Sequence, residues 1–184
     1  MPKEKKRRET EDRGRFEEAI EIILQHEGVG IDPENPTGYV NDPDDPGGET
    51  HFGITKRSYP SLAIGNLTRD EAIEIYKNDY WLKYNYDQIQ NDTLAFMLFD
   101  QAVLCGPVTV NRMIQAVLRK DLGDLDIEVD GILGDKTIYA LNSLEPHDLI
   151  NKFKIRAERR YRDLDKPKYL KGWLNRLNSF GGGS

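Results

Sequence analysis

The chain has 184 residues, a hydrophobic content of 38% and a formal net charge of −6. This length suits one domain, or one domain with a small appendage, and it allows a buried core. No run approaches the roughly 18 apolar residues of a membrane-spanning helix, and a single cysteine excludes an internal disulfide framework. The acidic balance excludes attraction to anionic polymers by net charge alone.

The first 15 residues form a charged segment, MPKEKKRRETEDRGR, in which lysines and arginines outnumber acids. Because no apolar segment follows, we expect no secretory signal peptide. We expect residues 1–15 to form a disordered basic tail. The tail is short and has no interleaved aromatic residues, so we expect no nucleic-acid binding.

Residues 16–27, FEEAIEIILQHE, have the pattern of an amphipathic helix. Its apolar residues recur at steps of three and four on one face: Phe16, Ala19, Ile20, Ile23 and Leu24. Glu27 lies about 1100° of helical rotation after Phe16, roughly 20° from the same face. Burial against apolar surface raises the pKa of a carboxyl group, and a protonated carboxyl is what a general acid requires. The alternative is that Glu27 ends a surface helix and points into water.

The rest of the chain predicts mostly helices. Residues 28–66 are rich in Gly and Pro and predict an irregular lobe with a short hairpin near Tyr39–Ile54. Thr68–Glu71 has the pattern of a capping box that opens a helix to about Leu82. Leu94–Leu104 is apolar nearly all round, which predicts a buried central helix. Further helices are expected at residues 108–122, after Asp135, at 147–164 and at 168–179, followed by a flexible tail at 181–184.

A longer motif follows Glu27-Gly28. After the segment Val29–Thr37, the chain reads GYVNDPDDPGGETHFGIT over Gly38–Thr55. Apart from the intervening segment, this pattern resembles the signature of glycoside hydrolase family 108, muramidases that cut peptidoglycan. Weaker similarity to the family continues over about residues 16–180, at Ile75-Tyr76-Lys77, Tyr80-Trp81, Phe99–Val103, Gly106-Pro107, Val129–Gly131, Gly134, Thr137, Arg156 and Gly172–Arg176.

The resemblance implies an active site in the first motif. It implies that Glu27 is the general acid, with Asp45 and Thr50 as further catalytic residues. It also implies substrate contacts at Tyr39, Asn41, Asp42, His51 and Gly53.

Several of these roles have alternatives. The second carboxylate could be any of the acids Asp42, Asp44, Asp45 and Glu49, and clustered loop aspartates often form turns instead. Asp45 is preferred because it occupies the acidic position of the family pattern. Thr50 could position a water molecule or a carboxylate, or only support the lobe. Tyr39 could stack on a sugar ring or only pack the loop.

The implied fold is a lysozyme-like α+β fold, mainly α. An irregular β-containing lobe is expected to pack on a helical lobe around the buried central helix. The catalytic domain would span residues 16–107, and a helical peptidoglycan-binding part would span residues 108–180 and pack on it. Basic residues of the 147–164 helix, Lys152, Arg156, Arg159 and Arg160, are candidate contacts to the anionic wall or simply a solvated helix face.

The implied function is hydrolysis of the β-1,4 bond between N-acetylmuramic acid and N-acetylglucosamine, with no cofactor and no metal. The alternatives are a lytic transglycosylase and a non-catalytic wall-binding or secretion-accessory module. We expect a monomer made in the cytoplasm of a bacterial host, which reaches the cell wall or periplasm through a holin or another export route. A phage endolysin, a virion component and a bacterial secretion-associated muramidase all fit the sequence.

Overall fold

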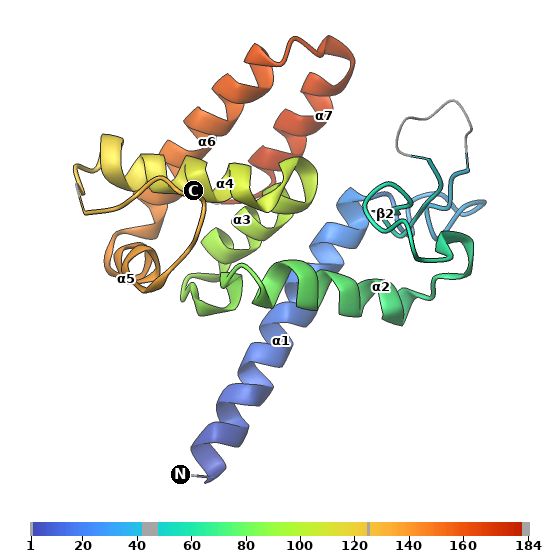
Figure 1. Cartoon of the computed structure of the whole chain (residues 1–184), viewed down its shortest axis with the longest axis horizontal. Helices are drawn as coiled ribbons and strands as arrows, with labels where there is room; N and C mark the ends of the chain where they lie inside the picture. The colour runs from blue at the N-terminus through green and yellow to red at the C-terminus, as the bar shows by residue number, and fades with distance from the viewer. Residues whose placement is uncertain (1, 42–47, 125, 182–184) are drawn as a thin grey trace. The chain divides into compact units, whose positions relative to one another are not determined.

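The computed structural model describes residues 2–41, 48–124 and 126–181. The chain divides into two compact units, Met1–Asp79 and Tyr80–Ser184, which are coloured from blue to red along the chain in Figure 1. The division falls within η2 (Lys77–Leu82), a π-helical segment. The domain boundary that the sequence places after residue 107 stays a prediction.

The first unit begins with one long helix, α1 (Pro2–His26). The apolar stripe expected from the sequence is confirmed, since Phe16, Ala19, Ile20, Ile23 and Leu24 are all buried. The helix starts well before Phe16 and includes the segment for which the sequence predicts disorder. Lys, Arg and Glu are good helix formers, and charged pairs four residues apart add support. Arg13 and Glu17 form such a pair, with 3.0 Å between Nε and Oε1.

A small antiparallel hairpin follows, as the sequence predicts. It consists of β1 (Thr50–His51) and β2 (Ile54–Thr55), in which His51 faces Ile54 and Thr50 faces Thr55. The two residues of the turn, Phe52 and Gly53, have φ values of 51° and 78°. Two successive positive φ values are typical of a type I′ turn, whose twist matches the twist of the strands. An isolated bridge pairs Val40 with Thr50.

A short 3₁₀ turn, η1 (Ile64–Asn66), leads to α2 (Arg69–Tyr76). The predicted capping box is confirmed. The Thr68 side chain accepts a hydrogen bond from the Glu71 backbone N–H, and the Glu71 carboxylate accepts one from the Thr68 backbone N–H. Two otherwise unsatisfied amides are thereby paired, and the start of α2 is defined. The helix continues into η2, so the helical pattern extends to Leu82 as expected.

The regular elements in the described residues of the second unit are all helical, and loops connect them. Its elements are η3 (Tyr86–Gln88), α3 (Asp92–Cys105), α4 (Pro107–Ala116), η4 (Val117–Asp121), α5 (Asp135–Ser143), α6 (Pro146–Asp163) and α7 (Pro167–Asn178). Every residue of α3 from Leu94 to Ala102 is buried, which confirms the predicted central helix. In Figure 1, α6 and α7 lie side by side as a helical hairpin. Within the described part of the chain, no helix is long and apolar enough to cross a bilayer.

A buried ion pair joins α3 to α7. Arg176 Nε lies 3.0 Å from Oδ1 and 2.9 Å from Oδ2 of Asp100, and the Asp100 side chain is fully buried. Gln101 donates from Nε2 to Asp100 Oδ2 at 3.0 Å, and the Tyr161 hydroxyl donates to Gln101 Oε1. A buried charge needs a partner and further hydrogen bonds, and this network supplies both.

A second polar network holds the loop at Asp130-Gly131. The Gly131 N–H donates to Gln115 Oε1 at 2.8 Å, and Asn111 Nδ2 donates to the Gly131 carbonyl at 3.0 Å. Gly131 has a φ of 91°, and a Cβ at this position would lie 2.8 Å from Val108 Cγ1. The Asp-Gly pair of the sequence motif therefore has a structural role, in which glycine allows the loop to approach α4.

Candidate active site

Glu27 occupies the carboxyl-terminal cap of α1. Its N–H donates to the Ile23 carbonyl at 2.9 Å, and the next residue, Gly28, has a φ of 86°. The Gly28 N–H donates to the Gln25 carbonyl at 3.0 Å, and the Val29 N–H donates to the Leu24 carbonyl at 2.9 Å. These two bonds define a Schellman motif, which ends a helix with a left-handed glycine. The Glu-Gly pair therefore fixes the backbone of Glu27, and its side chain is half-buried.

The hairpin turn packs directly against Glu27. A Cβ built on Gly53 would lie 2.7 Å from Glu27 Cγ and 2.5 Å from Tyr76 Oη. Real Cβ atoms essentially never approach other atoms so closely. Gly53 thus serves two needs, the positive φ of the turn and space for Glu27 beside it.

Phe52 is held in an uncommon backbone conformation by its neighbours. A non-glycine residue with φ near 51° is strained, at a cost of about 1–3 kcal/mol. The Phe52 N–H donates to the Thr37 carbonyl at 3.2 Å, and its carbonyl accepts from the Tyr76 hydroxyl at 3.1 Å. Such strain persists where surrounding contacts determine the conformation, and it is frequent at functional sites.

Substituting Gly53 tests this packing. We expect Gly53→Ala to lower both the free energy of unfolding and the activity on cell walls, because the new Cβ must displace Glu27 or Tyr76. Gly30→Ala is a matched control, since Gly30 has nearly the same φ, 77°, and nothing within 4 Å of its built Cβ. Both variants should lose about 1–2 kcal/mol to the left-handed conformation. Denaturant unfolding should show a further loss only for Gly53→Ala, and equal losses in both variants would contradict the packing argument.

Tyr39 and His51 lie together on the same lobe. The Tyr39 hydroxyl donates to Glu49 Oε1 at 3.0 Å, and this hydrogen bond raises the pKa of the tyrosine. The Tyr39 ring meets the His51 ring edge-on, with 5.2 Å between centroids, and the residue as a whole is 37% exposed. His51 stacks on Phe52 and is buried, with Nδ1 3.1 Å from the Ile64 carbonyl. Tyr39 therefore packs the loop while keeping part of its ring accessible.

The remaining predicted residues differ in what surrounds them. Thr50 exchanges both backbone hydrogen bonds with Val40, at 2.8 and 2.9 Å, and its hydroxyl donates to the Gly48 carbonyl at 3.4 Å. Asn41 is exposed. Asp42 and Asp45 lie outside the described residues.

The structure thus brings Glu27 and Gly53 together and adds Tyr76, to which the sequence analysis assigned no role. Tyr76 is buried and donates its hydroxyl to the turn that faces Glu27. The only sequence signal for it is the Ile75-Tyr76-Lys77 segment. That segment carries no chemistry of its own, so it could not show that Tyr76 supports the turn.

Comparisons with known proteins address the family and the fold of the chain. The glycosyl hydrolase 108 family matches residues 20–106, and a family described as "Predicted Peptidoglycan domain" matches residues 109–178. The solved structure of SagA from Brucella abortus is similar, with 24% sequence identity and a TM-score of 0.65 over 94% of this chain and 98% of that chain. No curated protein matches the sequence.

The mainly helical architecture with its small hairpin is a lysozyme-like fold, and the chain is a glycoside hydrolase. Residues 20–106 match the glycosyl hydrolase 108 family, and together with the peptidoglycan domain that follows they support a peptidoglycan hydrolase. The family, the fold class and the enzyme class expected from the sequence are therefore confirmed.

Proposed function

We propose that the chain hydrolyses the β-1,4 bond between N-acetylmuramic acid and N-acetylglucosamine in peptidoglycan, with Glu27 as the general acid. The observation that carries this proposal is the position of Glu27. The Schellman motif fixes its backbone, and the glycine turn of the hairpin leaves space for its side chain. Glycoside hydrolysis needs such a carboxylic acid to protonate the leaving oxygen while the sugar develops oxocarbenium character.

A second carboxylate supports the positive charge or activates the attacking water in most glycosidases. For this role we propose Asp45, because it occupies the acidic position of the family pattern. We propose that Thr50 positions the water or the carboxylate. Tyr39, Asn41, Asp42 and Gly53 are the proposed substrate contacts. The partly accessible ring of Tyr39 supports a sugar contact. His51, which the resemblance implies as a substrate contact, is buried, and we propose instead that it positions Tyr39 and Phe52.

Asp45→Asn tests the second role. If Asp45 acts on the reacting sugar, we expect a lower kcat with little change in KM, because Asn keeps the size but removes the charge. If Asp45 only forms a turn, Asn should be tolerated, since Asn fills the same turn positions. Steady-state kinetics on soluble glycan chains distinguishes the two, with Glu49→Gln measured in parallel. Wild-type kcat for Asp45→Asn together with a low kcat for Glu49→Gln would transfer the role to Glu49.

The product separates hydrolysis from transglycosylation. A hydrolase releases N-acetylmuramic acid with a free reducing end, whereas a lytic transglycosylase forms an anhydro product that is lighter by one water. Mass analysis of the sugar ends released from purified peptidoglycan should therefore show the hydrated form. Anhydro ends would overturn the hydrolase proposal. A wild-type chain that binds peptidoglycan without cleaving it would support the wall-binding or accessory alternative.

The place of action follows from the substrate. We infer that the chain is made in the cytoplasm of a bacterial host and acts at the cell wall or periplasm after passing through a holin or another export route. The peptidoglycan domain supports action at the wall.

A further inference from the structure

An arginine-lined groove lies between α4 and α6 in the second unit. Its volume is about 490 Å³, within the range of small-ligand sites. Arg112 of α4 and Arg156, Arg159 and Arg160 of α6 line it, together with Asp163. On α6 the lining residues recur at steps of three and four, so a single helix face supplies them. The groove concentrates positive charge in a chain whose net charge is −6.

The arginines of the groove differ in how they are paired. Arg156 binds Asp121 in a bidentate manner, with Nε 2.6 Å from Oδ2 and Nη2 2.7 Å from Oδ1. This contact holds the pKa of the Asp121 carboxyl below its usual value. Arg112 donates from Nε to the Asp130 carbonyl at 3.3 Å. The exposed Arg159 and Arg160 form no ion pair with any described residue.

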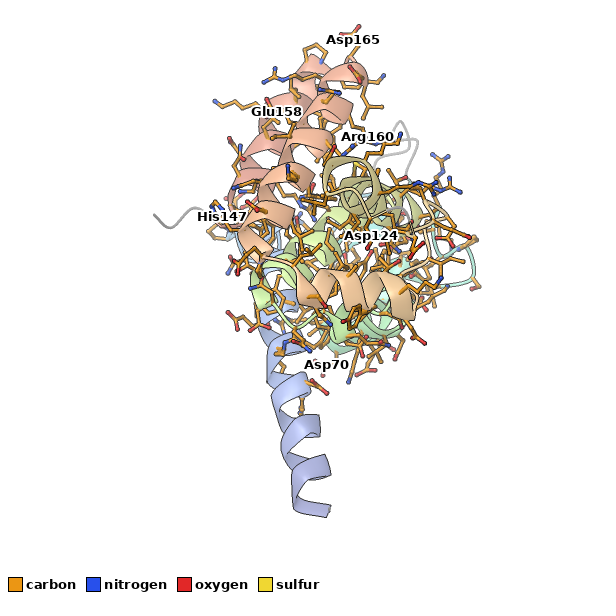
Figure 2. The ribbon with its side chains drawn as sticks, turned by 90° about the vertical axis from the view of Figure 1, so that its left-hand side faces the viewer. Asp70, Asp124, His147, Glu158, Arg160 and Asp165 are labelled. Atoms are coloured by element: carbon orange, nitrogen blue, oxygen red, sulfur yellow. The ribbon has the colours of Figure 1, made fainter. Side chains whose placement is uncertain are left out.

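The opposite side of α6 has a different character. There Arg162 pairs with Glu158, four residues earlier, at 2.7 Å. Figure 2 shows Arg160 and Glu158 on different sides of the helix, as their spacing of two residues requires. The two unpaired arginines of this helix, Arg159 and Arg160, therefore both line the groove.

We propose that this groove binds free carboxylates of the stem peptides of peptidoglycan. This inference rests on the proposed function, since it assumes peptidoglycan as the substrate. A guanidinium group matches a carboxylate with two parallel hydrogen bonds. Neutral sugar rings would instead call for aromatic stacking, and the described lining of the groove contains no aromatic residue. Met113 adds an apolar wall that suits the methyl side chains of alanine in such peptides.

The lining agrees only in part with the sequence-based hypothesis for this helix. Arg156, Arg159 and Arg160 line the groove, whereas Lys152 does not. The variant that best tests binding is therefore Arg159→Gln with Arg160→Gln. Its matched control is Lys152→Gln with Arg162→Gln, which removes the same charge from the same helix outside the groove.

Binding is measured with the full chain carrying Glu27→Gln, so that the wall stays intact, on insoluble peptidoglycan stripped of teichoic acids. The groove variant should bind at least roughly tenfold more weakly than the control variant. The difference should shrink as salt rises, because the Debye length falls from about 10 Å at 0.1 M to about 3 Å at 1 M. A soluble stem tetrapeptide should release the bound chain, whereas the same peptide with amidated carboxylates should not.

Equal binding by the groove and control variants would overturn the proposal. Release by inorganic phosphate but not by the tetrapeptide would also overturn it, since the groove would then fit a phosphate polymer. The single variants Arg159→Gln and Arg160→Gln give the same comparison if the double variant loses its fold. Product analysis with the chain that retains Glu27 tests the proposed function separately. If the wild-type chain cleaves peptidoglycan but the groove and control variants bind equally, only the groove proposal is rejected. If the groove variant binds more weakly but the wild-type chain does not cleave, only the proposed muramidase activity is rejected.

Discussion

Replacing Glu27 with Gln should reduce the rate of cell-wall clearance by about 10²- to 10⁴-fold, the usual contribution of a general acid. Gln has nearly the same size and can keep the cap conformation, but it cannot donate the proton that the leaving oxygen needs. The Schellman motif depends on backbone groups and on Gly28, so the end of α1 should be unchanged. The melting temperature should therefore stay close to that of the wild type.

The matched control is Glu34→Gln. Glu34 is exposed in the same unit, and the substitution changes the net charge by the same amount. In a turbidity assay, this variant should clear purified walls at the wild-type rate. If Glu27→Gln clears walls as fast as Glu34→Gln, the proton donor lies elsewhere and the proposed mechanism is wrong.

Replacing Arg176 with Met should lower the free energy of unfolding of the second unit by about 3–5 kcal/mol. The substitution leaves the fully buried Asp100 carboxylate without its guanidinium partner. Both tryptophans of the chain, Trp81 and Trp173, lie in the second unit, so their fluorescence during urea unfolding reports on it.

Two further variants make this measurement specific. Arg162→Met removes an exposed pair with Glu158 and should cost no more than about 0.5 kcal/mol. Asp100→Leu combined with Arg176→Met leaves no buried charge and should recover part of the stability lost in Arg176→Met. If Arg176→Met unfolds at the same urea concentration as Arg162→Met, the ion pair contributes little to stability.

Local patterns in the sequence predicted much of the fold. The apolar stripe from Phe16 to Leu24 and the apolar run of α3 predicted two buried helices, because their periodicity follows from helix geometry alone. The Thr68–Glu71 capping box predicted the start of α2 for the same reason. Glu27 could also be selected from local information, since it ends an apolar stripe and precedes glycine.

Other features depend on contacts between distant residues, which one sequence does not reveal. The charged pattern of residues 1–15 fits both a disordered tail and a charged helix, so it could not predict the extension of α1. Phe52 is an unusual residue for a type I′ turn, and its positive φ is stabilised by Thr37 and Tyr76. Likewise, the role of Gly53 becomes visible only when Glu27 and Tyr76 are in place around it.

The Asp100–Arg176 pair also relates the order of synthesis to the order of folding. The two residues are separated by 76 positions, and Arg176 belongs to α7, the last of the described helices. While the ribosome is still adding α7, the carboxylate of Asp100 has no guanidinium to neutralise it. The second unit therefore completes its core only after α7 emerges, and a nascent or prematurely terminated chain that ends before Arg176 is exposed to degradation.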